Sequence, residues 1–484
     1  MFFKKDRHVQ AEQINLDRVL LKLIPDSSYP DDWLTLRDVF EHILVTGSTG
    51  TGKTSTVGYH LAKSLLHAKG LGEEEKIGLV IFLYKASDLQ LWLRWCEEQG
   101  RSQDVVIIDD QQKDVFNILQ YYKDRDAISA VDALMNLSGL SLGGSAQKGS
   151  EEYWEQAKRQ RLHRLILLNQ LSGEPLNITT LSKLHSTAAQ NPGHLQDESF
   201  LNQSFCWQML GKAAEKVGEH HPQFALVEDY FVREMPYMAD RTRSSILSLT
   251  SAILEPFVSS PLLHNLFCGG TSLDLDTLLS GKIVLLNLPI QQYEYSGKLA
   301  QIMFKYVLQK RIESRNSDEF PNPVVLWLDE YQHYITPYDF LFLSTARSSR
   351  VGCVLLTQNI SNLYAQIGSD GRIAEERVNS LLSLTNHKFF LAQNSFVTNE
   401  FASKTIGMGI HKMGGTVIQM DQPTGSASLS EQYHYRVMPH EFTTLKRGGK
   451  HHHGIVEAYV TATGKRFSNG QNHLLVDFRQ PWSK

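Results

Sequence analysis

The sequence feature that most constrains this chain is a glycine-rich loop between an apolar run and a helical pattern. Residues Gly47–Thr54 read Gly-Ser-Thr-Gly-Thr-Gly-Lys-Thr, and the apolar run Ile43–Thr46 precedes them. This order fits G-x-x-x-x-G-K-[ST], a loop whose backbone N–H groups and following helix surround phosphate oxygens. A dinucleotide-binding turn is the rival interpretation, but Ser55 stands where its third glycine is needed. The loop therefore predicts binding of a nucleoside triphosphate.

The residue types of the loop predict its ligands more closely. Lys53 is expected to reach the β- and γ-phosphates, and the Thr54 hydroxyl is expected to ligate Mg²⁺. The phosphate cradle is expected to come from the remaining positions, namely Gly47, Ser48, Thr49, Gly50, Thr51, Gly52 and Ser55. The expected cofactors are ATP and Mg²⁺.

Short apolar runs, most of them separated by helical patterns, predict a mostly parallel sheet with helices between its strands. The runs are Ile43–Thr46, Ile77–Tyr84, Val105–Ile108, Ile283–Asn287, Val324–Leu328, Cys353–Thr357 and Lys388–Leu391. Two β-like pieces near the end, Ile455–Val460 and Asn472–Phe478, predict an edge hairpin. Helical periodicity dominates residues 113–265. We therefore expect an N-terminal segment (1–34), an α/β domain (35–112 and 266–484) and an all-α domain inserted in it (113–265).

A second chemical signal lies at the end of the apolar run Val324–Leu328. Asp329 and Glu330 follow this run directly, and ligands of open α/β sheets bind at the carboxyl ends of the strands. Asp329 is predicted to hold Mg²⁺ through water. Glu330 is predicted to act as the general base that polarises the attacking water. An ordinary acidic strand end is the alternative interpretation, which the phosphate-binding loop makes less attractive.

The next strand, Cys353–Thr357, contributes polar residues at both of its ends. Gln358 follows it and is predicted to contact the γ-phosphate or the water, since an amide both donates and accepts hydrogen bonds. Arg347 and Arg350 precede the strand, and Arg350 is the stronger candidate of the two. Arg350 is predicted to stabilise transition-state charge in the site of a neighbouring subunit. The alternative for either arginine is a solvated surface charge.

These motifs, in this order, resemble one known family. The phosphate-binding loop, a large helical region, LWLDEYQ at 326–332, an arginine-glycine approach to a strand and TQN at 357–359 look like the TraG/TraD coupling proteins of conjugative type IV secretion. These proteins belong to the FtsK/HerA group of P-loop ATPases, whose nucleotide-binding domain is RecA-like. Further resemblances are EEYWEQAKRQRLHRLI (151–166), MADRTRSSILSLTSAILEPF (238–257), LLSGKIVLLNLPIQQY (278–293), NHKFFLAQNSFVTNEFASKTIG (386–407) and VMPHEFTTLKRGGKHHHGIVEAYV (437–460).

The resemblance implies an ATP-dependent DNA translocase that forms a hexameric ring and works with a relaxase, a relaxosome or a secretion-channel ATPase. Family members usually carry two N-terminal transmembrane helices, for which the position of Gly47 leaves no room, so we expect no membrane segment in this chain. Two alternatives remain open. One is a DNA-processing or defence ATPase of the same group that acts with a nuclease, and the other is a non-motor adaptor that recruits secreted proteins.

The composition excludes several other classes of protein. The four cysteines are scattered without C-x-x-C spacing, so neither a disulfide framework nor a zinc site is expected. The start of the chain turns polar at once, and no run of about 18 apolar residues occurs. We expect a cytoplasmic protein whose attachment to the inner membrane, if any, is made by partners. Lys450–His453 is interpreted as an exposed loop rather than a metal site.

Overall fold

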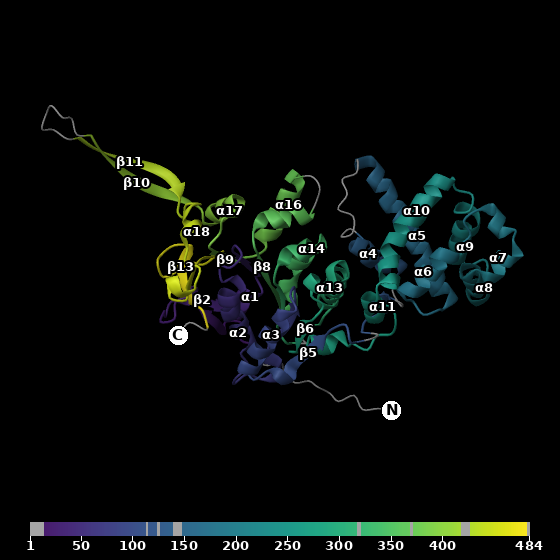
Figure 1. Cartoon of the computed structure of the whole chain (residues 1–484), viewed down its shortest axis with the longest axis horizontal. Helices are drawn as coiled ribbons and strands as arrows, with labels where there is room; N and C mark the ends of the chain where they lie inside the picture. The colour runs from purple at the N-terminus through teal and green to yellow at the C-terminus, as the bar shows by residue number, and fades with distance from the viewer. Residues whose placement is uncertain are drawn as a thin grey trace.

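The computed structural model describes residues 14–112, 115–122, 126–138, 148–316, 321–367, 371–417 and 426–481. Figure 1 shows a central sheet, a group of helices to its right and a long two-stranded arm at the upper left. The strands are β1 Val19–Lys22, β2 Trp33–Thr35, β3 Ile43–Thr46, β4 Gly78–Phe82, β5 Val105–Ile108, β6 Ile283–Leu286, β7 Val324–Leu328, β8 Val351–Thr357, β9 His387–Leu391, β10 Met408–Val417, β11 Ser426–Tyr435, β12 Ile455–Ala462 and β13 His473–Arg479.

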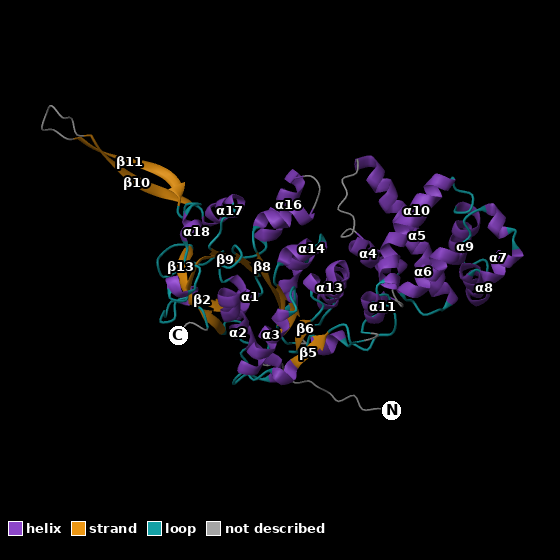
Figure 2. Cartoon of the chain, viewed as in Figure 1, coloured by secondary structure: helices purple, strands orange, loops and turns teal. Residues whose placement is uncertain are grey.

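The helices alternate with the strands of the sheet and also fill the long interval between β5 and β6 (Figure 2). They are α1 Leu36–Val39, α2 Tyr59–Leu66, α3 Ser87–Glu98, α4 Ala127–Ser138, α5 Lys148–Ser172, α6 Ile178–Thr187, α7 Glu198–Gln203, α8 Phe205–Val217, α9 Pro222–Glu228, α10 Asp240–Ser259, α11 Pro261–Phe267, α12 Leu275–Leu278, α13 Ile290–Glu313, α14 Tyr338–Thr345, α15 Ile360–Ile367, α16 Gly371–Ser383, α17 Phe396–Ile406 and α18 Glu441–Thr444.

The central sheet is mostly parallel, as predicted. In the described part of the chain it has nine strands in the order β13-β12-β9-β3-β8-β7-β4-β6-β5. The strands from β9 to β5 are parallel to their neighbours. The predicted edge hairpin is β12–β13, and β12 runs antiparallel to β9. This arrangement confirms the α/β, RecA-like fold class.

Most of the predicted apolar runs form buried strands because they have a core on both faces, whereas β5 at the sheet edge is only partly buried. On one face Val45, Ile81 and Trp327 pack with helices α1, α2 and α3. On the other face Leu44 and Leu326 pack in a continuous core with α13, α14 and the helices between β5 and β6. Strands β3, β4, β6, β7, β8 and β9 are buried at every residue. A strand covered on both faces has no polar alternation, and this is the pattern that the sequence carries.

Between β5 and β6 the described residues form helices α4 to α12 and no strand. The core of this helical region includes Leu165 of α5, Leu181 of α6 and Phe257 of α10. Two cations of α5 are buried, since Arg161 lies at 0% and Lys158 at 2% exposure. The Arg161 guanidinium packs on the rings of two aromatic residues of the same region. These two cations are therefore structural.

The domain boundaries proposed from the sequence stay a prediction.

An arm that the sequence analysis did not predict extends from the body beside α17. Strands β10 and β11 pair antiparallel over ten residues each, and Figure 1 shows them projecting from the body. Near the base of the arm Ile410 and Tyr433 face each other and are 65% and 64% exposed. The exposure of these two side chains differs from the two-sided burial that identifies strands such as β7 and β8 from sequence.

None of the helices described by the structure is by itself long and apolar enough to cross a membrane. One bent pair, α10 with α11, meets the criterion by length and composition only, with an angle of 87° between the two helices.

Candidate nucleotide-binding site

The glycine-rich loop leaves the carboxyl end of β3 in a conformation that its glycines permit. Gly50 and Gly52 have φ angles of 77° and 85°, where side chains other than hydrogen are disfavoured. A Cβ atom at Gly52 would lie 2.7 Å from Val456 Cγ2 of β12, so this position also needs the space. The Thr51 hydroxyl donates a hydrogen bond to the Ser48 carbonyl at 2.7 Å and closes the loop. The backbone therefore curls as a phosphate cradle requires.

The helix after the loop begins with a wide turn. Residues Lys53–Gly58, which include Thr54 and Ser55, form a π-helical turn, and the amides of Thr56 and Val57 both donate to the Gly52 carbonyl at 2.8 and 3.2 Å. The first N–H groups of a helix have no partner within it and carry its positive dipole end. Lys53 stands in this turn with 7% exposure. An anion at the loop would meet both the N–H groups and the ammonium group.

The two predicted carboxylates lie at the same edge of the sheet as the loop. Strand β7 is separated from β3 by β8, and the Thr54 hydroxyl donates to Asp329 Oδ2 at 2.6 Å. Burial raises the pKa of Asp329, while the Lys53 charge and the Thr54 hydrogen bond act in the opposite direction. A hydroxyl and a carboxylate in contact form the hard oxygen donor set that Mg²⁺ prefers. The residues at this position therefore fit the predicted cation.

Glu330 is held by two glutamine side chains. Its backbone is in the left-handed region with φ 55°. Gln332 Nε2 donates to Glu330 Oε2 at 2.7 Å, and Gln358 Nε2 lies 3.1 Å from both carboxylate oxygens. Burial tends to raise the pKa of Glu330, but the Lys53 charge and the hydrogen bonds from both glutamines outweigh it and leave the pKa below its ordinary value. Glu330 is therefore an oriented, ionised carboxylate.

The two predicted arginines lie away from the phosphate-binding loop of their own chain. Arg350 precedes β8, at the amino end of the parallel strands, whereas the phosphate-binding loop lies at their carboxyl end. Seven residues of strand, at about 3.3 Å each, put roughly 23 Å between Arg350 and this edge. Arg350 Nη1 donates to the Pro321 carbonyl, and Arg347 forms an ion pair with Glu41 at 3.0 Å. Neither arginine reaches the loop of its own chain.

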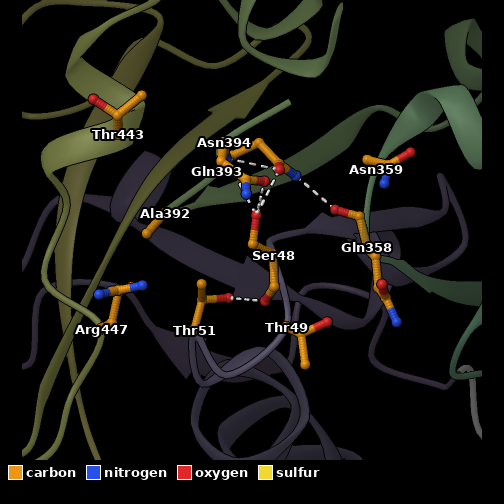
Figure 3. Close-up of a pocket in the computed structure, with 10 residues that line it drawn as sticks. All are labelled: Ser48, Thr49, Thr51, Gln358, Asn359, Ala392, Gln393, Asn394, Thr443 and Arg447. Atoms are coloured by element: carbon orange, nitrogen blue, oxygen red, sulfur yellow. Dashed lines mark hydrogen bonds between the residues drawn. The ribbon is translucent and has the colours of Figure 1, made fainter. Parts of the chain in front are cut away.

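The structure brings further residues to the loop that the sequence analysis did not identify. Ser48 Oγ lies 2.7 Å from Gln393 Oε1 and 2.7 Å from Asn394 Oδ1, at the end of β9 (Figure 3). These three residues border an open cavity of about 350 Å³. Its other lining residues are Thr49, Thr51, Gln358, Asn359, Ala392, Thr443 and Arg447. The sequence signal for Gln393 and Asn394 is the Gln-Asn pair shortly after β9, which parallels Gln358-Asn359 directly after β8.

A second cluster of metal-ligating groups lies at the opposite edge of the sheet. The side chains of Asp38, Glu41 and His387 bring their ligand atoms within 4.8 Å of one another. Lys465 Nζ lies 2.6 Å from Asp38, and Arg347 pairs with Glu41, so two cations already neutralise both carboxylates. This cluster is an ion-pair network. Lys450–His453 form an exposed turn, and the groups of metal-ligating residues found in the described ranges do not include it.

Comparisons with known proteins agree with this geometry. The family model described as "Type IV secretory system Conjugative DNA transfer" matches residues 3–452. A comparison with curated proteins gave no match. The fold is similar to the unbound bacterial conjugative coupling protein TrwBdeltaN70, with a TM-score of 0.60, 15% identity, and coverage of 97% of this chain and 88% of that chain.

Two structures of TrwB with bound nucleotides are similar to the same extent. The plasmid coupling protein TrwB in complex with ADP and Mg²⁺ has a TM-score of 0.61 and 15% identity, and the match covers 98% of this chain and 91% of that chain. The complex with the non-hydrolysable ATP analogue ADPNP has a TM-score of 0.58 and 16% identity, with coverage of 97% and 89%. At this identity the similarity shows the fold. Because the family model spans nearly the whole sequence, the resemblance to coupling proteins is confirmed, and this chain belongs to the type IV secretory system conjugative DNA transfer family.

Proposed function

We propose that this chain is the ATP-hydrolysing subunit of a motor that moves DNA toward a type IV secretion system. The observation that carries the proposal is the contact between Thr54 of the phosphate-binding loop and Asp329 of β7, with Glu330 beside it. A loop that only binds phosphate needs no oriented carboxylate beyond the metal ligand. An enzyme that transfers the γ-phosphate to water needs a second, oriented carboxylate to act as general base.

ATP and Mg²⁺ are the proposed ligands of the loop. The relatives TrwB with ADP and Mg²⁺ and TrwB with an ATP analogue share the fold over nearly the whole chain. In this chain the Thr54 hydroxyl and the Asp329 carboxylate would hold Mg²⁺, with water between the cation and Asp329. When bound, the cation neutralises charge on the β- and γ-phosphate oxygens.

Different residues of this chain bind the phosphates, activate the water and orient the general base. Lys53 and the loop N–H groups bind the β- and γ-phosphates. Glu330 orients a water molecule and accepts its proton as the water oxygen bonds to the γ-phosphorus and the bond to the bridging oxygen of ADP breaks. Gln358 holds Glu330 in place, and its amide can rotate to the γ-phosphate when nucleotide is present. The lowered pKa of Glu330 keeps the carboxylate in the basic form at neutral pH.

Assembly into a ring, of six subunits as the family resemblance implies, completes the proposed site. Because Arg350 stands at the opposite edge of the sheet from its own loop, it could reach a nucleotide only in a neighbouring subunit. A guanidinium from that neighbour would stabilise charge on the γ-phosphate. DNA would pass along the ring axis and be held by its phosphates, which suits a motor that must move any sequence. A relaxosome and a channel ATPase are the proposed partners, and contact with the inner membrane would be made through them.

The decisive experiment measures ATP hydrolysis by the purified protein without DNA and with single- or double-stranded DNA, alongside native mass. We expect hydrolysis that rises with DNA and with assembly, and its loss in Lys53→Ala and Glu330→Gln. Turnover of Lys53→Ala near the level of the parent would refute the assignment of the loop. Hydrolysis that does not respond to DNA, together with tight binding of a secreted protein, would favour an adaptor instead.

A further inference from the structure

The cavity beside the phosphate-binding loop has one wall that comes from the far end of the chain. Thr443 and Arg447 line it from the segment between the β10–β11 arm and β12. Figure 3 shows Arg447 beside Thr51, across the space from Gln393. Of the described residues that line the cavity, Arg447 is the one with a charge, and Ala392 is the one without a polar side chain. The described lining is therefore polar and includes a cationic group.

The backbone around Arg447 is fixed against the loop. Arg447 pairs with Val456 in an antiparallel bridge, and the Gly448 amide donates to the Ile455 carbonyl at 2.8 Å. The side chain of Val456 in turn fills the space that a Cβ atom at Gly52 would need. One bridge thus links Arg447 to the centre of the phosphate-binding loop. The position of this arginine relative to the loop is set by strand pairing.

Within the described residues, the side-chain charge of Arg447 has no partner. Its neighbours show the usual pairing, since Lys446 forms an ion pair with Glu457 at 2.6 Å and Arg436 donates to Gln471 at 2.6 Å. Among the residues that the structure describes, none forms a hydrogen bond or an ion pair with the Arg447 guanidinium. A cation that a rigid bridge holds at the rim of an anion-binding loop fits an anionic ligand.

The order of the strands indicates which part of the nucleotide would meet this cation. The carboxylates at β7 and the Arg447 segment at β12 lie on opposite sides of β3 in the order β12-β9-β3-β8-β7. Under the proposed function the γ-phosphate points toward Glu330, so the rest of the nucleotide extends toward β9 and β12. We propose that Arg447 binds the α-phosphate of the nucleotide held by its own chain. This inference rests on the proposed ATP site and adds a second cation, opposite the γ-phosphate, to that site.

The test is equilibrium binding of ADP and of inorganic tripolyphosphate, measured by calorimetry without hydrolysis. Arg447→Gln is expected to weaken the binding of both ligands about 10- to 100-fold, the range for loss of one charge-assisted contact. Arg447→Lys keeps the charge without the planar fork and should lie between Arg447→Gln and the parent. Lys450→Gln is the matched control, because it removes a positive charge three residues away that does not line the cavity. The affinity of Lys450→Gln for both ligands should stay within twofold of that of the parent.

The outcomes separate this inference from the proposed function. If Arg447→Gln binds ADP within twofold of the parent while Lys53→Ala does not bind it, the inference fails and the ATP site stands. If Arg447→Gln weakens ADP but leaves tripolyphosphate unchanged, Arg447 contacts the ribose or the base, and the α-phosphate assignment is wrong. If the parent binds neither ligand, the proposed function itself fails. Arg447 is exposed, so the variants should keep the melting temperature of the parent.

Discussion

A buried ion pair behind the candidate site permits a quantitative prediction. Lys305 of α13 and Asp339 of α14 lie 2.6 Å apart at 1% and 2% exposure. Asp339 also accepts hydrogen bonds from the Tyr331 hydroxyl at 2.8 Å and from Gln309 Nε2 at 2.9 Å. Because Tyr331 follows Glu330 directly, this pair fixes the turn that carries the proposed general base. Asp339→Asn removes the counter-charge of Lys305 with almost no change in shape.

The size of the effect follows from the charge left behind. Burial already lowers the pKa of Lys305 from 10.5, and the Asp339 charge opposes that shift. In Asp339→Asn, Lys305 must lose its proton on folding or stay charged in the core. At pH 7, which is 3.5 units below 10.5, loss of the proton costs about 4.8 kcal/mol at about 1.36 kcal/mol per unit. This agrees with the roughly 3–5 kcal/mol seen when one partner of a buried pair is removed.

The pH dependence has a definite sign. A lysine whose pKa is lower in the folded state binds fewer protons there than in the unfolded chain, so stability rises with pH up to about 10.5. The cost of Asp339→Asn should therefore fall from about 4.8 kcal/mol at pH 7 to about 2 kcal/mol at pH 9. Lys305→Met/Asp339→Asn should lose this dependence because no buried charge remains.

Urea unfolding at pH 7 and at pH 9 measures these free energies of unfolding. The unfolding curves from tryptophan fluorescence and from far-UV circular dichroism should coincide, as two-state unfolding requires. Glu376→Gln is the control, since it breaks the exposed pair Arg372–Glu376 and should cost less than about 1 kcal/mol. A cost of Asp339→Asn below about 1 kcal/mol, or one that does not change with pH, would refute the argument.

Two further predictions concern the loop and the ring. Mixing Arg350→Ala subunits with Glu330→Gln subunits, each inactive alone, should restore part of the ATPase activity, because a mixed interface can pair an intact Arg350 with an intact Glu330. No recovery at any ratio would exclude action of Arg350 between subunits. Gly52→Ala should destabilise the protein by about 1–3 kcal/mol more than Gly50→Ala, since both have positive φ but only Gly52 faces Val456. Equal melting temperatures of the two variants would contradict this.

The strands of the sheet and the residues at their ends could be predicted because the signal is local. A run such as Val324–Leu328 is apolar throughout since both of its faces are buried, and Asp329 is at the edge because it follows the run. The same rule places Gln358 after β8. It also places Arg350 before β8, away from the loop of its own chain, a consequence of strand direction that the sequence analysis did not use.

Other parts of the site depend on which strands become neighbours, and periodicity does not contain this information. Arg447 reaches the loop only because β12 runs antiparallel to β9 and begins at the nucleotide edge. Gln393 reaches it because β9 lies next to β3. The arm β10–β11 was not predicted because its pairing is not accompanied by burial near its base, where Ile410 and Tyr433 stay exposed. The burial of Arg161 and Lys158 in α5 likewise depends on helices that pack from elsewhere.

The position of β3 between β8 and β9 has a consequence for how the protein is made. Ile43 pairs with Val354 and with His387, so the first of these neighbours is translated 311 residues later (43 to 354). At roughly 5–20 residues per second, the ribosome needs about 15–60 s to supply it. During that time β3 has neither neighbour, and the glycine-rich loop has no strand end from which to curl. A chain released early would carry the phosphate-binding motif without a phosphate-binding site.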